Sequence, residues 1–168
     1  MTIAFRHTFN IDLVFAGRFG AQATSNLHLY ARYVSRKLGL KLAGGNVIPI
    51  DPSAKKVILC IDDDPSILRY ETALFERHGY TVITAASGQE GLWLVATTHC
   101  DAVVLDYEMP WMNGHDVAFE LKLRRPDLVI ILLSGSDVPT RALALVDAFV
   151  LKLEASKQLL PMIAELCN

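Results

Sequence analysis

The chain has 168 residues, of which 52% are hydrophobic, and a formal net charge of -2, so it can bury the core of one ordinary domain and carry a modest extra segment. Its three cysteines are widely spaced and include no CxxC pair, which argues against a zinc site and favours reduced packing residues in a cytosolic protein. No apolar run approaches the ~20 residues of a membrane span, and the N-terminus lacks the regions of a secretory signal, so we expect a cytoplasmic protein without a membrane span.

Charge divides the chain into two parts. Residues 1–50 hold six lysines and arginines against one acid, whereas residues 51–168 hold ten against seventeen. The run at 43–53 contains two glycines and two prolines and is interpreted as a linker. The sequence therefore predicts a basic N-terminal extension and linker over 1–53, followed by a folded domain over 54–168.

The extension contains one candidate for an amphipathic helix. Leu27, Tyr30, Val34 and Leu38 fall on one face of a helix, with basic residues elsewhere around it. A single helix lacks the partner helix of a helix-turn-helix reader, and the domain that follows is acidic. We therefore expect no binding of nucleic acid, and we expect the extension to be loosely ordered or docked on its own domain.

From Lys55 onward, short apolar runs alternate with amphipathic segments. The predicted strands are 57–61, 81–84, 103–105, 128–133 and 148–151, and the predicted helices are 65–78, 87–98, 114–123, a short one within 140–147, and 155–167. Buried strands that alternate with helices favour the α/β class. We predict a doubly wound parallel sheet of five strands in the order 2-1-3-4-5, with a short fourth helix.

Acidic side chains directly follow two of the predicted strands. Asp106 follows the strand at 103–105, and Asp62 and Asp63 follow the strand at 57–61. Because the carboxyl ends of neighbouring parallel strands meet at one edge of a sheet, we expect the three carboxylates to share a crevice. Two unit charges ~4 Å apart repel by about 4 kcal/mol at an effective dielectric constant near 20, so this cluster requires a cation. Oxygen-only ligands in an open cleft favour Mg²⁺.

A hydroxyl and a positive charge follow the last two strands. Ser134 comes directly after the strand at 128–133, and Lys152 directly after the strand at 148–151. With a carboxylate nucleophile and a divalent cation, these are the groups that phosphoryl transfer to an aspartate needs, because charge on three equatorial oxygens must be neutralised. Singly, each has a plainer interpretation: Asp106 as a turn cap, Ser134 as a turn residue and Lys152 as a solvated lysine.

Residues 55–167 resemble the receiver domain of two-component response regulators. The resemblance rests on the segments Ile61–Pro65 and Leu105–Gly114, on Ser134–Gly135 and on Lys152. It implies the flavodoxin-like form of the doubly wound fold. The resemblance implies that Asp106 is the phosphoacceptor. It implies that Asp63, Asp106 and the backbone carbonyl of Glu108 bind Mg²⁺, and that Asp62 assists through water. It also implies that the Ser134 hydroxyl follows the phosphoryl group, that Lys152 is its counter-ion and that Phe149 is an aromatic switch.

The resemblance also implies partners. The phosphodonor would be a histidine kinase or a histidine phosphotransfer protein, and the output would be contact with an unidentified downstream protein. The leading interpretation is a stand-alone receiver that catalyses only its own phosphorylation and dephosphorylation. The short fourth helix removes apolar area from a face on which such domains commonly dimerise, so we expect a monomer. Leu153 stands where the family usually has proline.

Two other function classes remain open. A receiver fold that is no longer phosphorylated would serve as a scaffold, although the complete set of acids together with Ser134 and Lys152 argues against this. A Mg²⁺-dependent phosphohydrolase would use Asp106 as its nucleophile. Against it, the second acid of that pattern is here Glu108, within a Met-Pro turn, and no substrate cap is evident in the sequence. Incubation with a small phosphodonor distinguishes the three classes.

Overall fold

The computed structural model describes residues 40–43, 46–49 and 54–167. They belong to two compact units, residues 1–54 and residues 55–168. The amphipathic helix expected between Leu27 and Leu38 lies outside the described residues. None of the described helices combines the length and the apolar character needed to cross a membrane.

The first unit contains a short antiparallel pair of strands. β1 (Leu40–Ala43) pairs with β2 (Asn46–Pro49) so that Leu40 lies opposite Pro49 and Ala43 lies opposite Asn46. The segment 43–53 predicted as a linker therefore contains β2 and the last residue of β1. Two consecutive glycines between short aliphatic runs are a hairpin signal, which the sequence interpretation did not use.

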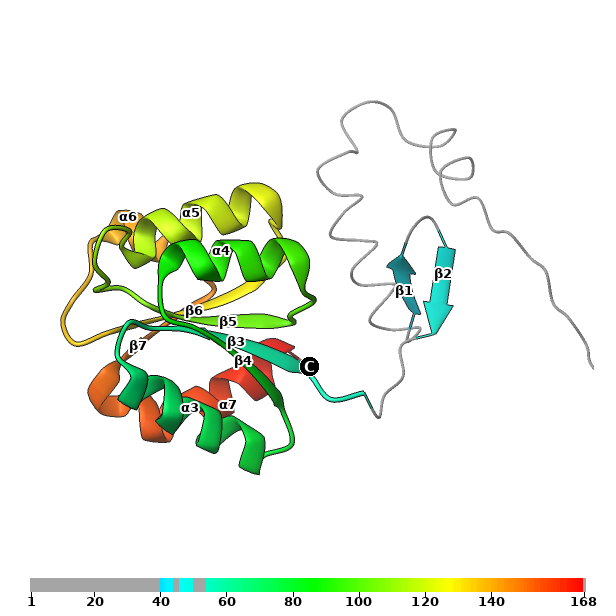
Figure 1. The fold of residues 1–168 in the computed structure, drawn as a ribbon, viewed down its shortest axis with the longest axis horizontal. Coiled ribbons are helices and arrows are strands. Elements are labelled where there is room, and N and C mark those ends of the chain that lie inside the picture. The colour runs from blue at the N-terminus through cyan, green and yellow to red at the C-terminus, as the bar shows by residue number, and fades with distance from the viewer. Residues whose placement is uncertain (1–39, 44–45, 50–53, 168) are drawn as a thin grey trace, which may run out of the picture. The chain divides into compact units, whose positions relative to one another are not determined.

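The second unit is built on a five-stranded parallel sheet, shown in Figure 1. Its strands are β3 (Val57–Ile61), β4 (Thr81–Ala85), β5 (Ala102–Asp106), β6 (Val129–Ser134) and β7 (Ala148–Leu151). They lie in the order β4-β3-β5-β6-β7, which confirms the predicted order 2-1-3-4-5. Every strand bound agrees with its prediction to within a residue.

Helices cover both faces of this sheet. On one face lie α4 (Gly88–Thr97), α5 (Gly114–Arg124) and α6 (Thr140–Leu143), and on the other lie α3 (Pro65–Arg77) and α7 (Ala155–Cys167), as Figure 1 shows. A short 3-10 helix, Lys152–Glu154, joins β7 to α7. The predicted short fourth helix is confirmed, since α6 has only four residues.

Local sequence signals explain where the helices begin. The Asp64 side chain accepts a hydrogen bond of 2.7 Å from the Ser66 backbone N–H at the start of α3, and proline occupies the first turn. Ser87 and Asn113 accept the equivalent bonds from Glu90 and Asp116 at the starts of α4 and α5. These caps fix where each helix leaves the carboxyl edge of the sheet.

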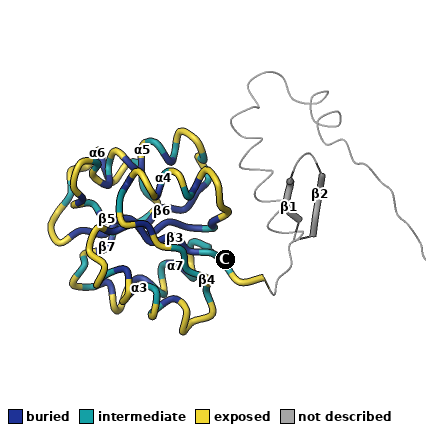
Figure 2. Tube along the Cα trace, viewed as in Figure 1, coloured by how far each residue is buried: buried dark blue, intermediate teal, exposed yellow. Residues whose placement is uncertain are grey.

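The central strands form the core because they are covered on both faces. Every residue of β5 and β6 is buried, and Figure 2 shows this buried layer between the exposed surfaces of the helices. Side chains alternate between the two faces. Leu59, Leu105 and Leu132 belong to the cluster beneath α4 and α5, and Cys60 and Ile131 to the cluster that includes α3 and α7 residues.

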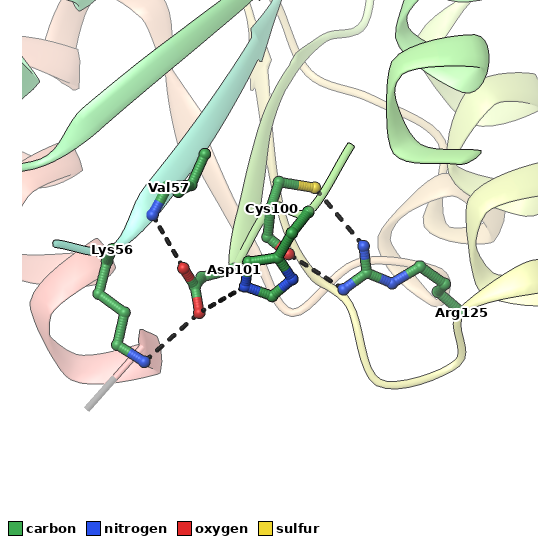
Figure 3. A network of polar contacts seen from close by, with 6 residues as sticks. Lys56, Val57, Cys100, Asp101 and Arg125 are labelled. Atoms are coloured by element: carbon green, nitrogen blue, oxygen red, sulfur yellow. Dashed lines mark hydrogen bonds and ion pairs between the residues drawn. The ribbon is translucent and has the colours of Figure 1, made fainter. Parts of the chain in front are cut away.

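Polar contacts tie together the edge of the sheet at which the strands begin (Figure 3). The Asp101 carboxylate accepts a hydrogen bond of 2.8 Å from the Val57 backbone N–H and forms ion pairs with Lys56 and His99. Burial raises the pKa of Asp101, but these partners outweigh it and the pKa is lowered. Arg125 donates to the Cys100 carbonyl at 3.0 Å. We refer to this set, Lys56, Val57, His99, Cys100, Asp101 and Arg125, as the amino-edge network.

Candidate functional site

Three carboxylates meet at the opposite edge of the sheet, as predicted. Oxygen atoms of Asp62, Asp63 and Asp106 all lie within 4.8 Å of one another. The strand register explains this, because Ile61 of β3 lies beside Leu105 of β5 and the acids follow directly. Asp62 and Asp106 are buried, with 1% and 2% of their surface exposed, whereas Asp63 is exposed. The cluster therefore consists of two buried acids and one acid that is exposed to solvent.

Lys152 forms ion pairs with both buried acids. Its Nζ atom lies 2.9 Å from Asp62 Oδ2 and 3.0 Å from Asp106 Oδ1. Burial acts to lower the pKa of Lys152, but the two carboxylates outweigh burial and the pKa is raised, so the ammonium stays charged. Burial and the charge of Asp62 together raise the pKa of Asp106, against the opposing effect of Lys152.

The buried acids retain capacity to bind a cation. Asp106 Oδ1 accepts no hydrogen bond with good geometry from any described residue, although Lys152 is close enough for an ion pair. An unsatisfied carboxylate oxygen is costly in a buried position. Because the neighbouring groups of Asp62 and Asp63 offer further oxygens within 4.8 Å, the donor set suits a hard cation such as Mg²⁺.

Ser134 lies at this edge but is hydrogen-bonded to the following loop. Its side chain is fully buried at the end of β6, and its Oγ accepts a hydrogen bond of 3.1 Å from the Ser136 backbone N–H. Among the hydrogen bonds of residues 54–167, none joins Ser134 to Asp106. The bond from Ser136 uses the Ser134 oxygen as acceptor, so the hydroxyl proton stays available for a negatively charged group in the crevice.

Glu108 connects the loops after β5 and β6. Its Oε1 atom accepts a hydrogen bond of 3.2 Å from the Ser136 hydroxyl. The sequence analysis assigned a role to the Glu108 backbone carbonyl and did not anticipate this side-chain contact. The sequence around Ser136 does not indicate this contact, because the contact depends on how close the two loops come after the sheet has formed.

Phe149 lies on β7 opposite Leu132 of β6. It is half-buried and packs against the cluster beneath α4 and α5. The structure thus places this aromatic ring three residues before Lys152, on the face of the sheet that carries α6. Phe149 therefore packs in the apolar layer and does not belong to the acid cluster.

The loop after Asp106 is tightly constrained by its glycine. A Cβ atom on Gly114 would lie 2.5 Å from the backbone oxygen of Asp106, so only glycine allows α5 to begin this close to the phosphoacceptor candidate. In the same loop, Trp111 has a φ angle of 67° and is fully exposed. A left-handed backbone at a bulky residue is strained, and such strain often occurs beside functional sites.

Sequence reasoning missed one buried acid near the site. Glu71 lies on α3 with only 2% of its surface exposed. Burial is the main cause that raises its pKa to about 8; the charges of Asp62 and Asp106 raise it further, while Cys60 and Lys152 lower it. The available signal was its spacing from Leu68 and Phe75, which puts a charged residue on the apolar face of a helix.

Comparisons with known proteins agree with this geometry. The profile of the response regulator receiver domain matches residues 58–164. The probable transcriptional regulator ycf27 of Cyanophora paradoxa is 38% identical over 109 residues, which cover 62% of this chain and 45% of that protein. The chain therefore spans about half the length of the curated relatives it matches.

Solved structures give the same result. The response regulator TrrA of Thermotoga maritima in complex with Mg²⁺ and BeF has a TM-score of 0.61 at 31% identity, over 66% of this chain and 98% of that one. TrrA in complex with the histidine kinase ThkA gives a TM-score of 0.61 at 31% identity, over 67% and 99% of the two chains. With the sheet order, the acid cluster and the matched profile in agreement, this chain belongs to the family of response regulator receiver domains.

Proposed function

We propose that this chain accepts a phosphoryl group on Asp106 from a histidine kinase or a histidine phosphotransfer protein and signals by protein contact. The observation that carries the proposal is the position of Asp106: buried at the carboxyl edge, beside Asp62 and Asp63, with Lys152 Nζ 3.0 Å from its Oδ1 atom. TrrA, a similar protein, forms a complex with a histidine kinase.

In the transfer, an Asp106 carboxylate oxygen forms a bond to phosphorus as the bond from phosphorus to the donor's imidazole nitrogen breaks. The imidazole keeps the electron pair of the broken bond. Lys152 neutralises charge on the phosphoryl oxygens, since its ammonium already lies beside the acceptor. The Ser134 hydroxyl donates a hydrogen bond to one of these oxygens, while the Ser134 oxygen accepts a hydrogen bond from the Ser136 N–H.

Mg²⁺ fits the acid cluster and supplies further charge neutralisation when it is bound. Asp63, Asp106 and the backbone carbonyl of Glu108 would hold the ion, with Asp62 assisting through water. The unsatisfied Asp106 Oδ1 atom is the structural observation that favours this assignment. Asp62 remains close to Lys152, so the site keeps one fixed positive charge of its own.

The test is phosphorylation by acetyl phosphate with Mg²⁺, followed by borohydride trapping and mass spectrometry. We expect the label on Asp106 and its loss in Asp106→Asn, while the exposed Asp116→Asn variant is labelled normally. A label that maps to Asp62, or that persists in Asp106→Asn, contradicts the proposal. Absence of any label supports the scaffold function, and rapid turnover of unrelated phosphate esters supports a phosphohydrolase.

We further propose that the protein acts in the cytoplasm as a monomer, without binding nucleic acid and without catalysis beyond its own phosphoryl chemistry. The short α6 helix supports the monomer, because four residues offer little apolar area for a dimer. Some of the similar proteins are named as transcriptional regulators. Sedimentation with and without beryllofluoride tests the oligomeric state: a monomer-to-dimer shift on activation contradicts the monomer.

A further inference from the structure

A hydrogen bond joins the two loops that follow β5 and β6. The Ser136 hydroxyl, two residues after the end of β6, donates to Oε1 of Glu108, two residues after the end of β5, at 3.2 Å. The two strands are neighbours in the sheet, with Asp106 beside Leu133. Ser136 and Glu108 are both exposed, whereas Asp106 is buried. The bond therefore lies on the solvent side of the proposed phosphoacceptor.

Ser136 is also held from inside the protein. Its backbone N–H donates to Ser134 Oγ at 3.1 Å, and Ser134 is fully buried. The neighbouring Gly135 leaves room for Glu108, because even a Cβ atom at Gly135 would lie 3.6 Å from Glu108 Oε2, an ordinary contact distance. The buried hydroxyl thus fixes Ser136, and Ser136 in turn holds the carboxylate of the opposite loop.

Phosphoryl transfer requires more access to Asp106 than this arrangement provides. The phosphorus atom of the donor must approach a carboxylate oxygen, but only 2% of Asp106 is exposed and its Oδ1 atom is buried. Within residues 54–167, the bond between Ser136 and Glu108 and the contacts of Lys152 are the side-chain links between different loops at this edge. A movement that separates the loops after β5 and β6 must therefore break the bond between Ser136 and Glu108.

We propose that Ser136 and Glu108 are positioning residues whose hydrogen bond is a latch: it holds the crevice closed, and phosphodonor and water reach Asp106 while it is open. The inference rests on the proposed phosphorylation of Asp106. When the phosphoryl group is lost, a water oxygen forms a bond to phosphorus while the bond from phosphorus to the Asp106 oxygen breaks. The carboxylate leaves with the electron pair, and one water proton passes to solvent. Both reactions use the open state, so the latch slows both.

The strength of one hydrogen bond sets the size of the effect. A hydroxyl that donates to a carboxylate shifts an equilibrium by about three- to tenfold. The rate of a reaction that needs the open state is proportional to the fraction of open molecules, so removal of the latch should accelerate labelling and loss alike. Equal acceleration leaves the plateau of labelled protein unchanged, whereas damage to the site would lower that plateau.

The test follows the mass of the intact full chain during incubation with acetyl phosphate and Mg²⁺, and again after the donor is removed. In Ser136→Ala we expect both rates to rise by about threefold or more, with the plateau unchanged. Ser136→Thr keeps the hydroxyl and should restore the wild-type rates. Asp137→Asn removes a charge from an exposed position of the same loop and should match the wild type.

A double-mutant cycle separates the latch from the charge of Glu108. Glu108→Met removes both the charge and the hydrogen-bond acceptor, so Ser136→Ala should change neither rate further in that background. Both side chains are exposed, and neither substitution removes buried packing. Unchanged rates or a lower plateau in Ser136→Ala, or an effect of Ser136→Ala that persists in Glu108→Met, overturns the latch and leaves the phosphorylation of Asp106 intact. A wild type that takes up no label overturns both.

Discussion

The Nζ atom of Lys152 lies 3.0 Å from Oδ1 of Asp106, so the fixed positive charge of the site is already beside the proposed phosphoacceptor. The two residues come from strand ends that are separated by β6 in the sheet. The long lysine side chain spans this separation, and it also reaches Asp62 at 2.9 Å. One ammonium thus compensates two buried carboxylates.

Lys152→Met should destabilise the Mg²⁺-free protein, because it leaves the buried acids uncompensated. The loss should be about 2 kcal/mol, less than for a fully buried pair, since 28% of the Lys152 side chain is exposed. Mg²⁺ should then raise the melting temperature of the variant more than that of the wild type. Thermal unfolding with and without MgCl₂ measures both effects. The exposed Lys157→Met is the control, and equal Mg²⁺ shifts would contradict the prediction.

Asp63→Asn should weaken Mg²⁺ binding by at least about tenfold, because it removes a charged oxygen ligand and leaves the fold intact. Asp63 is exposed at the entrance of the cluster, so the substitution changes no buried packing. Trp111 provides a fluorescence signal five residues from Asp106 when Trp93, the other tryptophan, is replaced by phenylalanine. Titration of Asp116→Asn in the same background should match the wild type. An unchanged dissociation constant in Asp63→Asn rules out direct ligation.

The free energy of unfolding should fall as the pH rises from the pKa of Glu71 in the unfolded chain to its pKa in the folded protein. Its pKa is raised from 4.5 to about 8 in the folded protein, so the unfolded chain loses its proton first. The contribution of Glu71 to the free energy of unfolding is fully present below pH 4.5 and is lost by pH 8. At pH 7 the loss is about 3 kcal/mol.

Glu71→Gln removes this ionisation and should be more stable than the wild type at neutral pH. Urea unfolding from pH 4.5 to pH 9 measures the difference in unfolding free energy, which should widen as the pH rises to about 8 and then level off. Glu76→Gln, at an exposed position of the same helix, should track the wild type. A constant difference between Glu71→Gln and the wild type would show that Glu71 is already ionised when folded.

Gly114→Ala should destabilise the protein by about 1–3 kcal/mol and slow labelling of Asp106, because the new Cβ atom would lie 2.5 Å from the Asp106 backbone oxygen. The start of α5 must move away, and the loop that carries Glu108 moves with it. Gly135→Ala is the matched control on the opposite loop, where the nearest atom, Glu108 Oε2, would be 3.6 Å away. Thermal unfolding and acetyl phosphate labelling of both variants test this. Similar behaviour of the two alanines would mean that α5 adjusts without cost.

The sequence predicted the parts of the structure that depend on local pattern and topology. β3, β7 and α7 have the predicted bounds, and the meeting of Asp62, Asp63 and Asp106 follows from parallel strand order alone. The contact between Glu108 and Ser136 was missed, because it depends on the approach of two loops that no periodicity describes. Glu71 was missed because a helix with one acid on its apolar side keeps an amphipathic pattern.

The amino-edge network has a consequence for protein engineering. Asp101, Val57 and Arg125 hold the beginnings of the strands, while the repelling carboxylates stand at the ends of the same strands. Substitutions that stabilise the fold at the amino edge and substitutions that change the chemistry at the carboxyl edge should therefore have additive effects, because the length of the strands separates them.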